Sequence, residues 1–165
     1  MMNNFDQLKQ EFLRELQGTK KLLEALPADQ MGYKPHEKSM SILAMATHIV
    51  DLTGWPAHVL KGDSLDLAGS YRSPKYESKE DLLKGLEELS AQVEKAINEA
   101  NDDELSKNFV LKSGDYVIME SPKSDVIRFI VNNHIYHHRG QLTVYLRLLD
   151  LPVPGLYGPS ADDKK

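Results

Sequence analysis

The sequence predicts an all-α protein, a four-helix bundle with at least one crossover connection. Four long segments repeat their apolar residues at helical spacing, and two long connections separate them. No internal repeat or low-complexity tract divides the chain, so we expect a single domain over residues 1–165. With 41% hydrophobic and 27% charged residues, the 165-residue chain has the composition of an ordinary soluble domain. A chain of this length buries roughly two-thirds of its unfolded surface and needs no covalent staple.

The first two helices are expected in the N-terminal third of the chain. An apolar stripe runs over Asn4–Leu26, and Pro27 ends it. The second helix is expected to begin at Ser39, a good N-cap residue. Pro56 lies inside this second segment, where it removes a backbone donor and clashes with the preceding turn. A kink or an early end near Gly54 is therefore predicted.

The third and fourth helices have clearer starts. The third is expected to open at Ser78, with Asp81 three residues later as a weak capping box. The fourth is expected to have Ser121 as its cap and Pro122 in the first helical position, and to run to Leu149. A proline-rich tail follows it.

The two connections differ in character. The polar stretch 61–77 is long enough to span the height of a bundle, which allows the second and third helices to run parallel. Between Asn108 and Glu120, two short apolar runs flank a turn that contains Gly114. This pattern predicts a short β-hairpin before the fourth helix.

Composition excludes several classes of function. The chain has no cysteine, which excludes disulfide frameworks, iron–sulfur clusters, cysteine-rich zinc sites and a cysteine nucleophile. A net charge of -5 argues against a protein that binds the phosphate backbone of nucleic acids. No segment has the ~20 apolar residues that span a bilayer, and the N-terminus lacks a secretory signal. We therefore expect a cytoplasmic protein with neither a nucleic-acid nor a membrane partner.

Three of the six histidines fall on apolar helix faces. At about 100° per residue, His134 and His138 lie about 40° apart, in the centre of the apolar stripe of the last helix. His48 is central on the core face of the second helix. Counted from the expected helix ends, His48 lies at nearly the same height as His134 and His138 if the two helices are antiparallel. The heights also agree if the helices are parallel.

A single histidine on such a face is usually a buried neutral imidazole bonded to a backbone carbonyl. Three together are harder to satisfy, because each unpaired buried group costs about 1–3 kcal/mol. A divalent cation partners all three, and His-x-x-x-His is the spacing at which two imidazoles of one helix reach one ion. The sequence therefore favours a metal site over three separately satisfied histidines.

The spacing also excludes two known kinds of metal site. Ile135 follows His134, so the His-Glu-x-x-His motif of zinc proteases is absent. No glutamate stands three residues before any of the three histidines, so the di-iron signature of ferritin-like bundles is missing. A mononuclear three-histidine site remains, with open positions for water or a thiol, whose pKa the ion would lower.

Four stretches of the chain resemble the DinB-like (damage-inducible, YfiT-like) family of metal-binding four-helix bundles. They are Tyr33–His36, Met45–Ile49, the His-x-x-His-His-Arg-Gly-Gln block within Asn133–Leu142, and Pro152–Ser160. The resemblance covers nearly the whole chain. It implies an up-down-down-up bundle with a long crossover after the second helix, and a homodimer.

The resemblance also implies a function. The family's metal ligands correspond to His48, His134 and His138, which would hold one divalent transition metal, with zinc or nickel expected. Some members are transferases that use low-molecular-weight thiols such as bacillithiol or mycothiol. The expected activity is therefore a metal-dependent thiol transferase acting on small electrophiles, with the thiol as cosubstrate. The alternatives are a metal-dependent hydrolase, a non-catalytic stress-related metal-binding bundle, and a plain structural bundle.

The remaining candidates are residues around the three imidazoles, and no catalytic residue is assigned. Gln141 and Asp51 are candidates to orient a ligand by hydrogen bonding, with packing and solvation as the respective alternatives. His137 lies at the edge of the stripe, in a position for a supporting or interface role. Tyr145 offers a phenol near the site, although tyrosine on a core face is more often packing. Arg139 points away from His134, which suits a salt bridge or a dimer contact.

Overall fold

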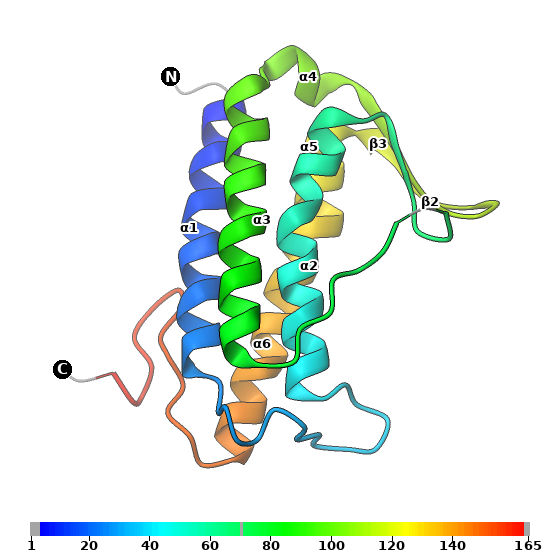
Figure 1. Ribbon diagram of the computed structural model, residues 1–165. Coiled ribbons are helices and arrows are strands. Elements are labelled where there is room, and N and C mark those ends of the chain that lie inside the picture. The colour runs from blue at the N-terminus through cyan, green and yellow to red at the C-terminus, as the bar shows by residue number, and fades with distance from the viewer. Residues whose placement is uncertain (1–3, 70, 164–165) are drawn as a thin grey trace.

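The computed structural model describes residues 4–69 and 71–163 and has four long helical segments lying side by side (Figure 1). The helices are α1 (Asn4–Ala25), α2 (Ile42–Lys61), α3 (Lys79–Glu99), the short α4 (Asp102–Ser106), and a final run of α5 (Lys123–Asp125), η1 (Val126–Asn132) and α6 (Asn133–Leu148). The strands are β1 (Ser64–Asp66), β2 (Asn108–Ser113) and β3 (Tyr116–Pro122). The protein is therefore mostly helical, as predicted, with a small sheet at one end.

The helix α2 lies at the centre of the helix packing. This helix contacts α3 along its length and also packs against α6 and η1, while α1 packs against α3. In Figure 1, α2 and α3 point the same way, and the connection between them crosses in front of α2. None of the described helices is long and apolar enough to cross a membrane.

Two helix starts test the predicted caps. The Ser78 side chain accepts a hydrogen bond from the Asp81 backbone N–H, so this predicted cap is confirmed. For α2 the predicted cap was wrong by two residues: Ser41 accepts from the Ala44 N–H at 3.1 Å. The residues before Ser41 form a separate turn, closed by the Ser39 N–H bonded to the His36 carbonyl.

Pro56 lies inside α2 and does not end it. Of the predicted kink or early end near Gly54, the early end was therefore wrong. The helix continues to Lys61, and all residues from Ile49 to Ala57 are buried. An internal proline costs a helix about 3 kcal/mol. Burial of this part of α2 on every side offsets that cost. Packing of the central helix thus overrides the local signal.

The start of the last helix also differs from the prediction. Ser121 and Pro122 end β3, and the helical run starts at Lys123 without a side-chain cap. Its seven residues Val126–Asn132 are π-helical, so the run is α-helical again only from Asn133. The regular spacing of the last helix therefore holds from Asn133 onward, which includes both of its central histidines.

The predicted hairpin is confirmed, and it belongs to a sheet of order β1-β2-β3. Gly114 has φ +60 in its turn, a conformation that glycine adopts without strain. The strand β1 was not predicted; it pairs in parallel with β2, with Leu65 opposite Leu111. A three-residue strand in a polar connection carries too little periodicity to be recognised.

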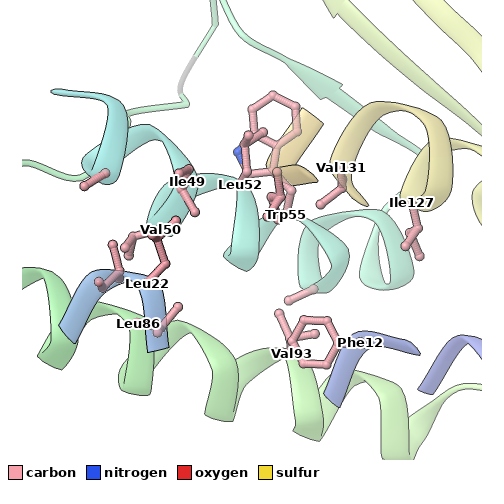
Figure 2. Close-up of a cluster of buried hydrophobic side chains, with 14 of the residues drawn as sticks. Phe12, Leu22, Ile49, Val50, Leu52, Trp55, Leu86, Val93, Ile127 and Val131 are labelled. Atoms are coloured by element: carbon pink, nitrogen blue, oxygen red, sulfur yellow. The ribbon is translucent and has the colours of Figure 1, made fainter. Parts of the chain in front are cut away.

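The core fills the space between the four long segments. Figure 2 shows side chains from all of them meeting, among them Phe12 from α1, Leu52 from α2, Val93 from α3 and Val131 from η1. Leu52, Val93 and Val131 are completely buried. This apolar centre holds the helices at fixed distances, which positions the polar groups on their seams.

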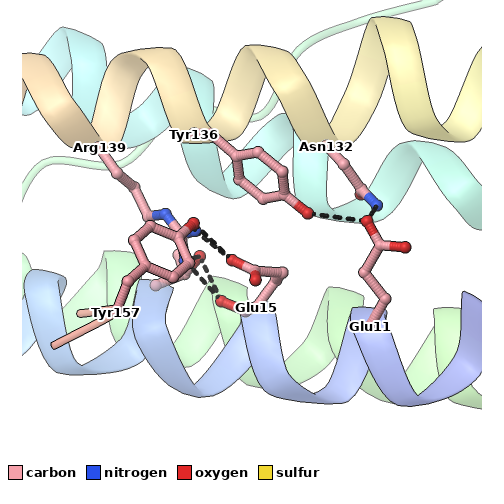
Figure 3. A network of polar contacts seen from close by, with 7 residues as sticks. Glu11, Glu15, Asn132, Tyr136, Arg139 and Tyr157 are labelled. Atoms are coloured by element: carbon pink, nitrogen blue, oxygen red, sulfur yellow. Dashed lines mark hydrogen bonds and ion pairs between the residues drawn. The ribbon is translucent and has the colours of Figure 1, made fainter.

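One such polar group joins α6 to α1 and the C-terminal tail (Figure 3). Arg139, 1% exposed, donates to the Glu15 carboxylate, to the Glu15 carbonyl at 2.8 Å, and to the Tyr157 hydroxyl. The Tyr157 hydroxyl donates in turn to Glu15 at 2.8 Å. The predicted salt bridge of Arg139 is thus confirmed, and it ties the tail to the helices.

Candidate metal centre

His48, His134 and His138 come together on the seam between α2 and α6. The Nε2 atoms of His48 and His134 are 3.3 Å apart. One ring nitrogen of each histidine lies within 4.8 Å of those of the other two. The three ring centroids are 4.6–5.0 Å from one another. The juxtaposition predicted from helix spacing is therefore present, with two rings from one helix and one from its neighbour.

Local structure explains this arrangement. His134 and His138 lie four residues apart in the α-helical part of the last run, so both project from one side of it. His48 lies in the first half of α2, which packs against α6. All three imidazoles are half-buried, so they are shielded by the helices and still reachable from solvent.

The geometry and the donor set fit a transition-metal ion. Two nitrogens bound to one tetrahedral zinc ion at about 2.0–2.1 Å lie about 3.4 Å apart. The 3.3 Å between His48 and His134 agrees with that separation. The widest pair, at up to 4.8 Å, needs side-chain movement on the order of 1 Å to close on an ion. Three imidazoles carry no charge, so a bound divalent ion keeps its positive charge and open positions.

Burial favours the neutral, metal-binding form of His48 and His134. Burial, reinforced by the nearby imidazoles, lowers the pKa of His134 to about 4. Burial and the His138 imidazole also lower the pKa of His48, and the Asp51 carboxylate acts in the opposite direction. A neutral imidazole has a free lone pair, whereas an imidazolium does not. At pH 7 the site is therefore prepared to coordinate a cation.

Gln141 lies where the sequence suggested. Its Oε1 is 2.7 Å from Nδ1 of His138, one turn earlier on the same helix. An amide oxygen accepts only, so Nδ1 of His138 carries the proton and its Nε2 keeps the lone pair. Such a hydrogen bond fixes both the tautomer and the orientation of a ligating histidine.

Asp51, His137 and Tyr145 lie near the centre in different ways. The Asp51 carboxylate accepts from the Tyr71 hydroxyl rather than from an imidazole. His137 is exposed, with its ring centroid 5.1 Å from that of His138. Tyr145 is 6% exposed and donates to the Met40 carbonyl at 3.2 Å, which ties α6 to the turn before α2.

The other two histidines lie outside the centre. His36 is exposed, and its Nδ1 accepts from the Lys38 N–H at 3.2 Å. His58 is exposed on α2, where its ring packs edge-on to Tyr71 at 5.7 Å.

Sequence reasoning missed Tyr71, which links the crossover connection to α2. Besides donating to Asp51, its hydroxyl accepts from Nε1 of Trp55 at 2.8 Å. Burial and the Asp51 carboxylate raise the pKa of the Tyr71 phenol far above its usual value. No local pattern signals this residue, because a lone tyrosine in a polar connection has no periodicity and its partners are 16 and 20 residues away.

The described architecture defines a class: helical proteins with a cluster of three histidines on a helix seam that could hold one metal ion. The model of the DinB family matches residues 1–165, and the chain belongs to this family.

Similarity to individual proteins supports the same fold. A DinB-like protein from Bacillus cereus ATCC 10987 aligns with a TM-score of 0.69 at 23% identity, over 90% of this chain and 94% of that one. The DinB-like protein YjoA from Bacillus subtilis aligns with a TM-score of 0.70 at 21% identity, over 88% and 96%. A putative DinB family member from Exiguobacterium sibiricum 255-15 covers 98% and 99%, with a TM-score of 0.64 at 18% identity.

One curated relative matches in sequence. The uncharacterized protein YrdA of Bacillus subtilis (strain 168) is 38% identical over 48 residues. This match spans 29% of the present chain and 28% of YrdA.

Proposed function

We propose that the protein binds one divalent transition metal through His48, His134 and His138 and uses it to transfer a low-molecular-weight thiol to small electrophiles. The observation that carries the proposal is the convergence of three imidazole nitrogens within 4.8 Å of one another. Membership of the DinB family supports a metal-binding role. Zinc and nickel are the proposed metals, because both are well suited to imidazole ligands.

The donor set favours activation of a thiol or of water over a purely structural ion. Structural zinc sites are closed by four protein ligands, whereas catalytic sites have three and keep an open position. When bound, the ion supplies Lewis acidity, which lowers the pKa of a coordinated thiol or water toward neutrality. The role of the protein is to keep His48 and His134 neutral through burial and to orient His138 through Gln141.

A thiol reaction on this chain requires an external thiol. The protein contains no cysteine, so the reacting sulfur has to come from a cosubstrate. In the proposed reaction the sulfur forms a bond to an electrophilic carbon, the leaving group departs with the electron pair of the broken bond, and the thiol proton passes to solvent. No oxidant or reductant is consumed.

Metal-loaded protein incubated with bacillithiol or mycothiol and 1-chloro-2,4-dinitrobenzene tests this proposal. We expect metal-dependent formation of the thioether with release of chloride. The activity should disappear in His138→Ala and persist in His137→Ala, a matched change at the adjacent exposed histidine. Tight metal binding without turnover of any thiol or ester would make the protein a non-catalytic metal-binding bundle. Ester hydrolysis without thiol would make it a hydrolase, and absence of metal binding would leave a structural bundle.

Three further proposals concern the setting of the site. The directions of the long helices in Figure 1 support an up-down-down-up topology. The outer face of α6 exposes Val144 and Leu148, at 55% and 56%, which supports a homodimer. A cytoplasmic location agrees with the use of small intracellular thiols. Size-exclusion chromatography with light scattering tests the dimer directly.

A further inference from the structure

A cavity lies on α2 one helical turn beyond His48. Its volume is about 710 Å³, within the range of about 300–1,000 Å³ that is typical of small-molecule sites. It is bounded by α2, by α3 and by the connection that follows α2. No metal ligand lines it, so the cavity is separate from the three-histidine cluster.

Asp51 is the buried polar group in this wall. The residue is 5% exposed and lines the cavity, and its carboxylate accepts from the Tyr71 hydroxyl. Among residues 4–69 and 71–163, Asp51 forms no ion pair. A buried carboxylate without a cationic partner is unfavourable, and a cation placed beside it removes that penalty.

The other charged groups of the cavity wall are already partnered. Asp66 accepts from the backbone N–H groups of Ala68 and Gly114, at 3.0 and 2.9 Å, and pairs with Lys112. Arg72 is exposed, and its Nη1 donates to two carbonyls of its own segment, at 2.6 and 2.7 Å. Water screens the charge of such an exposed guanidinium. Among the described residues of the wall, Asp51 is thus the buried charged group without an ion pair.

The rest of the wall is suited to an apolar body. Leu65, Pro74 and Leu89 line it from β1, the connection and α3. The ring of Tyr71 also lines the cavity, and packing against His58 and Trp55 holds it in place. An aromatic ring face next to a carboxylate favours an organic cation through cation–π attraction.

We propose that this cavity binds a small primary amine with an apolar body, whose ammonium group pairs with the Asp51 carboxylate while its body packs against Leu65 and Leu89. The ligand chemistry follows from a buried carboxylate without an ion pair among the described residues, beside the apolar and aromatic part of the wall, formed by Leu65, Tyr71 and Leu89. The site is independent of the metal and adds a second binding function to the protein.

Isothermal titration calorimetry with two probes of equal shape tests the charge requirement on the unmodified protein. 2-Phenylethylamine is cationic at pH 7, and 2-phenylethanol is its neutral counterpart. We expect the amine to bind with a Kd of about 1 mM or below, at least about tenfold tighter than the alcohol. Equal affinity of the two probes, or no binding of the amine, would overturn the proposal whatever the behaviour of any variant.

Two matched variants locate the charge. Asp51→Asn removes the charge and retains an oxygen that accepts from Tyr71, so we expect a folded protein with at least about tenfold weaker amine binding. Asp29→Asn makes the same change at an exposed residue outside the cavity and should leave amine binding unchanged. Unaltered affinity in a folded Asp51→Asn protein would contradict the assignment.

One variant distinguishes the proposed amine binding from the proposed metal binding. His134→Ala removes a proposed metal ligand on α6, and His134 is not among the residues that line the cavity. We expect this variant to lose metal and to keep amine binding within about twofold. Loss of amine binding together with metal would show that the amine occupies the metal centre instead and would overturn a separate site.

Discussion

Two faces of the same helix, α6, carry polar clusters of opposite character. On one face Arg139 meets Glu15 and Tyr157, and the guanidinium, the carboxylate and the hydroxyl are hydrogen-bonded to one another (Figure 3). On another face His134 and His138 meet His48, and every group in the cluster is of the same kind. The first cluster pairs a positive with a negative side chain inside the protein, and Nε of Arg139 is its buried atom without a hydrogen-bond partner in the described part of the chain. The second brings three imidazole nitrogens within 4.8 Å of one another.

This difference is the reason for giving the first cluster a structural role and for proposing a metal-binding role for the second. A buried ion pair whose partners are all present is suited to holding elements together, here α1, α6 and the tail. In the histidine cluster, by contrast, neighbouring imidazoles disfavour each other's protonation. The metal ion proposed above would give the three imidazole nitrogens a common partner.

The largest expected effect is on metal binding by the histidine cluster. His138→Ala removes one of three proposed ligands, and we expect metal affinity to fall by about 1,000-fold or more, because the binding energy of such sites is shared among few ligands. Metal content by mass spectrometry and calorimetric titration measure this. His137→Ala is the control and should retain full metal content; equal losses in both variants would show that neither imidazole is specific.

A change in the Arg139 cluster should alter the stability of the protein rather than its metal affinity. Arg139→Met removes the cationic partner of the Glu15 carboxylate, whose side chain is only 13% exposed. We expect a loss of about 3 kcal/mol in the free energy of unfolding, measured by urea denaturation, and unchanged metal affinity.

A matched arginine provides the control for that loss. Arg147 pairs with Asp162 at the surface, with its side chain 52% exposed, and Arg147→Met should cost about 0–1 kcal/mol. Similar losses in the two variants would mean that burial does not distinguish the two ion pairs.

A smaller effect is expected from the group that orients one imidazole. Gln141→Leu removes the 2.7 Å hydrogen bond to Nδ1 of His138 and keeps a side chain of similar size. We expect metal affinity to fall by about 10-fold, with the free energy of unfolding of the metal-free protein nearly unchanged. Gln141→Glu, which still accepts the hydrogen bond, should restore the affinity; failure of this rescue would contradict an orienting role.

The smallest effect is a pH dependence of the metal-free protein. The pKa of His134 is lowered from 6.5 to about 4 in the folded state. Between these values the unfolded chain binds a proton that the native state does not, so stability falls as the pH decreases from 6.5 toward 4. We expect the Tm to drop by a few degrees over this range and His134→Gln to flatten the dependence. Coincident profiles of the two proteins would contradict the shift.

Much of the helical framework could be predicted from local pattern. The cap at Ser78 and the hairpin turn at Gly114 depend on residues close in sequence, and both are present. The failures occurred where distant contacts compete with local preference. Pro56 stays inside a helix because its surroundings are buried, and the pairing of β1 with β2 joins segments 46 residues apart, with Ser64 opposite Val110.

The amino-acid sequence by itself determined the helical class and the four-residue spacing that aligns His134 with His138, because both follow from the geometry of one helix. Only the tertiary structure decided that His48, 86 residues before His134, meets them, and that Tyr71 closes over Asp51 beside a cavity. The physical reason is that local sequence sets which way a side chain projects from its own helix. Packing of the whole core sets which side chains of other elements it meets.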